Sequence, residues 1–144
     1  KVFDFDVNII SKGQDAILEK IREINSLGND ASVKEKGLLT VLEVAFEMSK
    51  RNIKLEKVDL YNSDAKKFKL SENNTIIPPF LAIPGLGDVV AEKIYQEAKE
   101  SEFISVEDLK ERTGASKTVI EELTNSGCID NLSNTNQLTF NFSL

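Results

Sequence analysis

The sequence predicts a mainly helical α+β fold, in which an αα-hairpin with a small sheet is followed by short helices joined by tight turns and by a flexible tail. Apolar residues recur at helical spacing in both halves of the 144-residue chain, and short runs of strand character lie between them. Residues 1–82 hold 13 basic and 13 acidic side chains, whereas residues 83–144 hold 5 and 11. Pro78, Pro79 and Pro84 mark this change, and they predict a boundary between two regions near that stretch.

The αα-hairpin is predicted from two helical segments joined by a short connection. The first has an apolar face formed by Ile17, Ile21, Ile24 and Leu27. Gly28 stands where a helix would end in a left-handed turn. Ser32, with Glu35 three residues later, is typical of a capping box that opens the second helix, which we expect to run to about Arg51.

Three segments of strand character follow the hairpin, at residues 57–61, 65–70 and 74–80. Strand alternation would put Val58 and Leu60 on one face, and Phe68 and Leu70 on one face. We therefore expect a small sheet that packs on the αα-hairpin.

The second half is predicted to be a series of short helices. The first runs from Asp88 to about Ala98, the second is capped by Ser105, and the third follows a turn at residues 113–116. The closing residues from 131 onward are polar, rich in Asn and without helical periodicity. We expect them to be an exposed tail.

Composition excludes several classes of function. The chain has no His, so catalytic groups that depend on His are impossible, and Cys128 alone cannot form an internal disulfide or a two-cysteine metal site. The acidic residues of the second half have no calcium-loop spacing and are interpreted as a solvated surface. We therefore expect no metal site, and Cys128 is interpreted as a small buried apolar residue. No apolar run approaches the roughly 20 residues of a membrane span.

The most specific local signal is the segment FLAIPGLGDVVAEKI at residues 80–94. Gly85 and Gly87 allow a tight hairpin and a close approach of the backbone to a phosphate, because no Cβ intervenes. The helix predicted to begin at Asp88 would offer unpaired amides and the positive end of its dipole. Ile83 and Leu86 would anchor the hairpin in the core. The Asp88 carboxylate would compete with the phosphate, and a plain turn between two helices is the structural alternative.

Basic clusters elsewhere are ambiguous. The first cluster is Lys50, Arg51, Lys54 and Lys57, and the second is Lys66, Lys67 and Lys69. Either cluster could contact a DNA backbone, and the first could instead complement the dipole at the end of a helix. A formal net charge of -6 argues mildly against a large nucleic-acid surface.

Residues 80–94 resemble the helix-hairpin-helix DNA-binding motif. Over nearly its whole length the chain also resembles the C-terminal end of the PolC-type DNA polymerase III alpha subunits, the replicative polymerases of low-GC Gram-positive bacteria. The resemblance is carried by five segments in the family order, at residues 35–51, 57–68, 76–87, 102–123 and 136–140.

The resemblance implies a division into three parts. Residues 1–75 would be the end of a fingers-like region, residues 76–132 a tandem helix-hairpin-helix domain that binds duplex DNA, and residues 133–144 a tail. The segment TGASKT would be the second, degenerate hairpin, and it adds Gly114, Ser116 and Lys117 to the DNA-binding residues. The family's Mg²⁺-binding polymerase carboxylates and its 3'-5' exonuclease lie in other regions, so we assign no catalytic residue and no cofactor here.

The resemblance also implies a sliding-clamp binding peptide in the tail. Gln137 and Leu138 match the family pattern, and a six-residue form of the motif places Phe140 and Phe142 as anchors. The expected partners are therefore duplex DNA, the sliding clamp and the rest of a cytoplasmic polymerase chain, of which this sequence would be a piece. Two other functions stay open from the residues alone: a helix-hairpin-helix module of a repair protein, and a helical protein-interaction domain that does not bind DNA.

Overall fold

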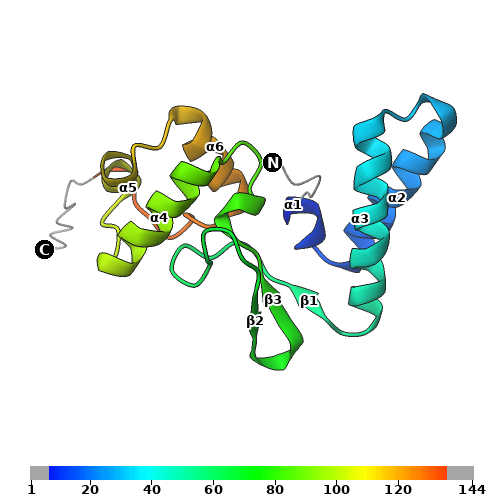
Figure 1. Cartoon of the computed structure of the whole chain (residues 1–144), viewed down its shortest axis with the longest axis horizontal. Helices are drawn as coiled ribbons and strands as arrows, with labels where there is room; N and C mark the ends of the chain where they lie inside the picture. The colour runs from blue at the N-terminus through cyan, green and yellow to red at the C-terminus, as the bar shows by residue number, and fades with distance from the viewer. Residues whose placement is uncertain (1–6, 136–144) are drawn as a thin grey trace, which may run out of the picture.

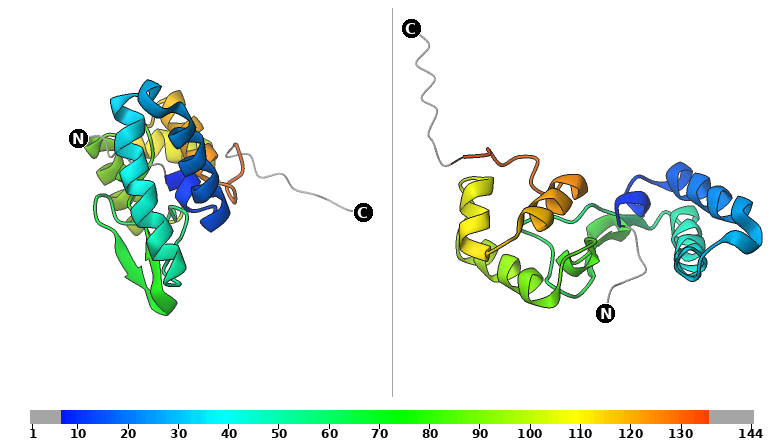
Figure 2. Two further views of the ribbon diagram at one scale, coloured as in Figure 1. Left: turned by 90° about the vertical axis from the view of Figure 1, so that its right-hand side faces the viewer. Right: turned by 90° about the horizontal axis from the view of Figure 1, so that it is seen from above.

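The computed structural model describes residues 7–135, and its helices form two groups with a small sheet between and below them (Figure 1). Helices α2 and α3 lie at one end of an elongated molecule, and helices α4 to α6 lie at the other. The view from above shows the same separation (Figure 2). Helix α1 (Val7–Ile10) lies between the two groups, and Val7 is buried in the core of the second.

The predicted αα-hairpin is present as α2 (Gln14–Leu27) and α3 (Val33–Lys50), joined through the 3-10 helix η1 (Gly28–Asp30). The capping box is confirmed, because the Glu35 amide donates to the Ser32 hydroxyl while the Ser32 amide donates to the Glu35 carboxylate. The hydrogen bonds that the Glu35 carboxylate accepts from the amide and the hydroxyl of Ser32 hold its pKa below the usual value. The pair has a small core of its own, formed by Ile10, Ile17, Ile24, Ala31, Leu42 and Ala45.

The sheet is smaller than predicted. Strands β1 (Lys54–Leu55), β2 (Lys69–Ser71) and β3 (Thr75–Ile77) lie in the order β1-β3-β2, with β1 parallel and β2 antiparallel to β3. Leu55 pairs with Ile76, and Leu70 pairs with Ile76 from the other side. The 3-10 helix η2 (Glu72–Asn74) makes the tight connection between β2 and β3.

Two expectations about the sheet are wrong. Residues 57–61 form no strand; Asp59 instead accepts hydrogen bonds from the amides of Tyr61 and Asn62, which turns the chain. The sheet also does not bury Phe68 and Leu70 against the αα-hairpin, since Leu70 is 79% exposed. Val58 and Leu60 are buried as expected, but they pack with the second group of helices.

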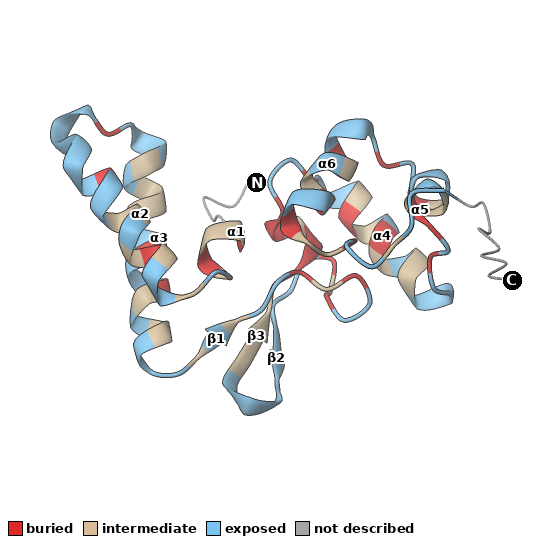
Figure 3. Cartoon of the chain, turned by 180° about the vertical axis from the view of Figure 1, so that it is seen from behind, coloured by how far each residue is buried: buried red, intermediate tan, exposed pale blue. Residues whose placement is uncertain are grey.

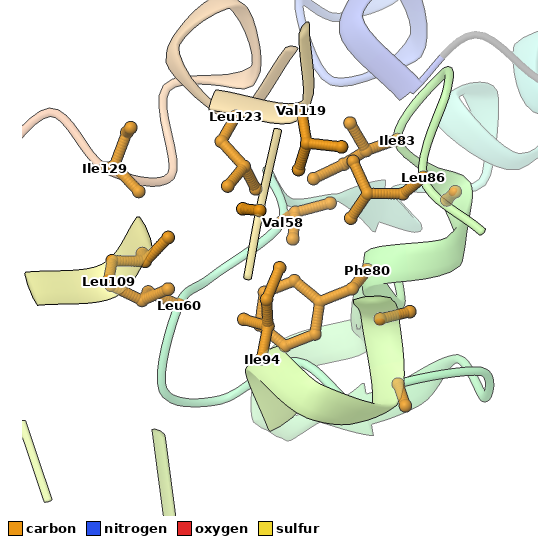
Figure 4. Packing of buried hydrophobic residues seen from close by; sticks show 14 of the residues in the cluster. Val58, Leu60, Phe80, Ile83, Leu86, Ile94, Leu109, Val119, Leu123 and Ile129 are labelled. Carbon is orange, nitrogen blue, oxygen red and sulfur yellow. The ribbon is translucent and has the colours of Figure 1, made fainter. Parts of the chain in front are cut away.

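The second group contains the 3-10 helix η3 (Phe80–Ala82), α4 (Asp88–Glu100), α5 (Val106–Thr113) and α6 (Lys117–Ser126). Phe80, Ile94 and Leu123 are almost inaccessible to solvent and lie at the centre of its core (Figure 4). Buried residues concentrate where these helices face one another, whereas the outer faces of the helices and the sheet are mostly exposed (Figure 3).

The first residues of the predicted tail are bonded to the folded part of the chain. The carbonyls of Ser133 and Asn134 accept hydrogen bonds from the amides of Val106 and Glu107, with N···O distances of 2.8 and 3.3 Å. This segment therefore closes the N-terminal end of α5, where Ser105 also caps the helix. The flexible tail predicted from the sequence falls mainly on residues outside those described.

Candidate nucleic-acid interface

The first hairpin is a tight turn between η3 and α4. The amide of Leu86 donates to the carbonyl of Ile83 at 3.2 Å, which closes a four-residue turn. Pro84 and Gly85 occupy its two central positions, and Gly85 has φ +80°, the conformation that a type II turn requires at its third residue. Glycine adopts this φ without the steric cost of a Cβ atom. The fold therefore requires a glycine at position 85.

Gly87 has a different role, because its backbone is extended (φ −87°, ψ 169°) and any residue can adopt it. It is the N-cap of α4, and its carbonyl accepts the first helical hydrogen bond, from Ala91 at 3.0 Å. A Cβ atom added at Gly87 would meet no atom within 4 Å. Open space therefore lies directly beside the backbone at Gly87, and nothing within the described residues requires glycine at this position.

The amides at the start of α4 are left open. No side chain caps the helix, and no group within residues 7–135 accepts a hydrogen bond from the amides of Asp88, Val89 or Val90. Val89 is 83% exposed, so this end of the helix faces solvent. Unpaired amides and the positive end of the helix dipole together favour an anion.

Ile83 and Leu86 anchor the hairpin from beneath. Both are buried in the same hydrophobic core as Val119 and Leu123 of α6 (Figure 4). The two apolar positions of the motif thus hold the turn in place, as the sequence predicts, while the glycine positions face outward.

The segment predicted as a second hairpin lies between α5 and α6 and repeats the backbone of the first. Gly114 has φ +69° and ends α5, Ala115 is buried like Leu86, and Ser116 is extended (φ −71°, ψ 166°) like Gly87. Its chemistry differs at the helix start, because the Ser116 hydroxyl accepts a hydrogen bond from the amide of Val119 at 3.2 Å. Lys117 stands where the first hairpin has Asp88.

The charges around the two turns are unequal. Asp88 is exposed at the first, and the Glu122 side chain of α6 also lies there, with its Cγ 3.8 Å from the Cβ position of Gly85. Lys117 is exposed at the second. Anion binding at the first turn would therefore rely on backbone amides, and at the second turn on a cationic side chain.

The structure also places the other chemistry-bearing residues of the sequence. Burial raises the pKa of the Cys128 thiol to about 11, which keeps it protonated at neutral pH. Of the basic clusters, Lys69 donates to the carbonyl of Asn62 at 2.7 Å, and Lys54 lies on β1. Within the described residues there is no group of three or more His, Cys, Asp or Glu side chains that could hold a metal ion. No described helix has the length and apolarity to cross a membrane.

Sequence reasoning missed two features of this region. The first is that only the single 3-10 turn η3 precedes the first hairpin in place of a full helix, although the closely spaced prolines were a signal for it. The second is Arg112, whose side chain joins α4 to α5 and which no motif singles out. The four predicted clamp-binding residues, Gln137, Leu138, Phe140 and Phe142, lie outside the described residues.

A sequence model of the helix-hairpin-helix motif matches residues 52–138, and the chain belongs to that family. The matched range begins before the sheet and includes the loop that carries Val58 and Leu60, which share the core of α4 to α6. The matched range therefore includes the loop, the sheet and the helices that surround the first hairpin.

The chain is similar to proteins named DNA polymerase III PolC-type. It is 52% identical over 136 residues to the one from Clostridium perfringens, and 48% identical over 136 residues to those from Oceanobacillus iheyensis and Bacillus subtilis. Each match covers 94% of this chain but only 9 or 10% of the relative. The similarity expected from the five sequence segments is confirmed, and the chain spans about a tenth of the length of these relatives.

Proposed function

We propose that this chain is the duplex-holding part of a bacterial replicative DNA polymerase of the PolC type, and that the amides at the start of α4 bind a phosphate of the DNA backbone. The observation that carries the proposal is that open helix end: Gly87 leaves space beside the backbone, and the amides of Asp88, Val89 and Val90 are unpaired within the described residues. The similarity to proteins named DNA polymerase III PolC-type supports DNA as the ligand that carries this phosphate.

Such a site would bind DNA without reading its sequence. Backbone amides contact phosphate oxygens, which are the same at every base pair, so the contact positions the duplex and specifies nothing. This property suits a replicative polymerase, which must hold whatever duplex it has just made. It also weakens the objection raised by the acidic composition, because amide donors need no Lys or Arg side chain.

We further propose that the turn at Gly114 is the second hairpin of a tandem pair. The same backbone conformation recurs there, and Lys117 could reach a phosphate as a point charge even though Ser116 satisfies one amide internally. With one or two phosphates neutralised, the logarithm of the affinity should fall with the logarithm of the salt concentration with a slope of about -1 to -2.

The remaining chemistry of the polymerase would lie outside this chain. In the proposed parent protein, Mg²⁺-dependent nucleotidyl transfer and 3'-5' exonuclease activity belong to other regions, and the cell compartment would be the cytoplasm. This chain contributes binding alone. The purified 144 residues should therefore give no primer extension and no nuclease activity with Mg²⁺ or Mn²⁺, and activity abolished by substituting one of its own carboxylates would contradict the assignment.

The direct test of the site is Gly87→Glu, measured by fluorescence anisotropy with a labelled duplex. Position 87 has an ordinary φ and open space, so we expect the variant to fold. The added bulk and charge at the point of closest approach should lower duplex affinity about tenfold or more, the value of one charge-assisted hydrogen bond. Gln96→Glu adds the same charge on an exposed part of the same helix and should change affinity less than twofold. An unchanged affinity for a folded Gly87→Glu variant would show that the hairpin does not bind DNA.

The tail carries a separate proposal, that residues 137–142 bind the sliding clamp. Its support is the pattern of Gln137, Leu138, Phe140 and Phe142 within a segment otherwise made of Asn, Ser and Thr. Burying such aromatic rings in a partner's pocket recovers roughly 1.5–3 kcal/mol each, which a solvated ring forgoes. Ordering the segment costs about 1–2 kcal/mol per residue, so we expect an affinity of only about micromolar.

Replacing Phe140 and Phe142 by Ala tests this second proposal. Clamp affinity, measured by isothermal titration calorimetry, should fall about tenfold or more, and the melting temperature should hardly change. A large loss of melting temperature with clamp binding intact would show instead that the two rings belong to the core of this chain.

A further inference from the structure

Arg112 joins the end of α4 to α5 through an unusually complete set of hydrogen bonds. Its Nη2 donates to the carbonyls of Glu97 (2.7 Å) and Ser101 (3.2 Å). Its Nε donates to the Glu97 carboxylate at 3.1 Å, and its Nη1 donates to the carbonyl of Glu102 (3.2 Å) and the carboxylate of Asp108 (3.3 Å). One guanidinium thus fastens the last turn of α4, the connection and the first turn of α5.

The surroundings of this guanidinium distinguish it from an ordinary surface ion pair. Its side chain is 20% exposed, and those of Glu97 and Asp108 are 18% and 16% exposed. The guanidinium carbon also lies 4.4 Å from the centre of the Phe103 ring, and Asp108 accepts a further bond from the amide of Ile104. A rigid, planar fork held on several sides fixes an orientation in a way that a flexible surface pair cannot.

The position of Arg112 connects it to both hairpins. The first hairpin begins α4, to whose far end Arg112 is fastened. The second hairpin follows α5 directly, with Gly114 only two residues beyond Arg112. The angle between α4 and α5 therefore contributes to where the start of α6 lies relative to the start of α4.

We propose that Arg112 is a positioning residue that holds the two hairpins at the separation at which one DNA backbone can contact both. The inference rests on the proposed function, because it assumes that each hairpin binds phosphate. Once the first phosphate is bound, the second contact becomes intramolecular, and the affinity that it adds depends on the distance and orientation between the two turns. Loosening the joint between α4 and α5 weakens the second contact, although Arg112 is not itself one of the groups that contact DNA.

The experiment compares Arg112→Met with Lys93→Met by duplex anisotropy over a range of salt concentrations. Each variant loses one positive charge and one ion pair to the Glu97 carboxylate, but Lys93 pairs with it from within α4 and bridges no elements. Arg112→Met should weaken binding about fivefold to tenfold, and its salt slope should become less steep by about 0.9, the contribution of one phosphate. Lys93→Met should change affinity less than twofold and leave the slope unchanged.

A double variant separates this inference from the proposed function. With Gly87→Glu already blocking the first hairpin, Arg112→Met should have no further effect on duplex affinity, since there is no second contact left to align. Equal losses in both backgrounds, or equal affinity and slope for the two Met variants, would overturn the positioning role. If Gly87→Glu alone has no effect, the proposed function fails instead.

Arg112→Lys keeps the test decisive if Arg112→Met does not fold. Lysine keeps the charge and the stem but cannot form the fork, so we expect a folded protein with the same loss of salt slope. A folded Arg112→Lys variant with wild-type affinity and slope would contradict the proposal.

Discussion

The turn at Gly85 and the turn at Gly114, which we propose as the second hairpin, have similar backbone conformations and differ in how the amides of the following helix are satisfied. Gly85 and Gly114 both have positive φ, and Leu86 and Ala115 both anchor the turn in the core. The next position separates them, because Gly87 has no side chain whereas the Ser116 hydroxyl caps α6. The two turns therefore have the same geometry, and the residue at the N-cap, Gly87 or Ser116, determines whether the helix amides are open to a ligand.

The contrast extends to charge and points to two ways of binding a phosphate. Asp88 follows Gly87, and Lys117 follows Ser116. The first hairpin offers fixed amides beside a carboxylate, while the second offers a mobile ammonium beside an amide that is already satisfied. Fixed amides lose no side-chain entropy on binding, whereas a lysine loses up to about 2 kcal/mol of it. We therefore expect the first hairpin to contribute the larger share of affinity.

Among the variants that compare the two turns, Leu86→Ala should cause the largest loss of unfolding free energy. Leu86 is 6% exposed, and truncating a buried leucine leaves a cavity that costs roughly 2–5 kcal/mol. Urea denaturation should show this loss, and the first hairpin should loosen with it. The position equivalent to Leu86 in the second hairpin is Ala115, which has little side chain to lose. A Leu86→Ala loss below about 1 kcal/mol would mean that the turn is not anchored by the core.

Alanine at Gly85 and at Gly114 should cost about 1–2 kcal/mol of unfolding free energy each, because both have a φ that a Cβ atom disfavours. Gly87→Ala is the matched control, with φ −87° and open space, and should change the unfolding free energy little, because the lower entropy of the unfolded chain offsets the poorer N-cap preference of alanine. The three variants are compared in the same urea titration. Equal losses at all three positions would contradict the division between fold-required and ligand-facing glycines.

A smaller pair of changes should move duplex affinity in opposite directions. Asp88→Asn removes the competing carboxylate and should tighten binding by about fivefold or less, the value of one unit charge near 4 Å in water. Lys117→Gln should weaken binding by a similar factor and make the salt slope less steep by about 0.9. Anisotropy titrations at several salt concentrations measure both. Changes in the same direction would contradict the proposal that Asp88 opposes DNA binding at the first turn and Lys117 supports it at the second.

Most of the helical fold could be predicted from the sequence, because its determinants are local. Helix spacing and the caps at Ser32 and Ser105 act within a few residues, and each gave an element close to its observed bounds. The absence of the expected strand at 57–61 was not predictable in this way, since Asp59 turns the chain there and Val58 packs on residues far along the sequence. Likewise, nothing in residues 133–134 indicates that their carbonyls close the start of α5.

The turn of the candidate site was predicted from its residues, whereas the DNA contacts assigned to those residues stay a prediction. The pattern from Ile83 to Gly87 identified both the anchors and the glycines. It could not show that Gly85 is required by its φ while Gly87 is not, because that depends on the backbone path. The joint at Arg112 was not predictable either, since its acceptors are mostly backbone carbonyls, which carry no sequence signal.

The most direct test of the proposed phosphate site is the duplex affinity of Gly87→Ser, a variant that gives α4 the serine N-cap that α6 has at Ser116. The backbone at position 87 already has N-cap geometry, and we expect the new hydroxyl to accept a hydrogen bond from the amide of Val90, as Ser116 does from Val119. Thermal denaturation should show a stability unchanged or raised by a few tenths of a kcal/mol. Duplex affinity should fall by about tenfold, because the amide and the space beside it are no longer open. A capped, equally stable variant that binds duplex as well as the wild type would contradict the claim that the start of α4 holds a backbone phosphate.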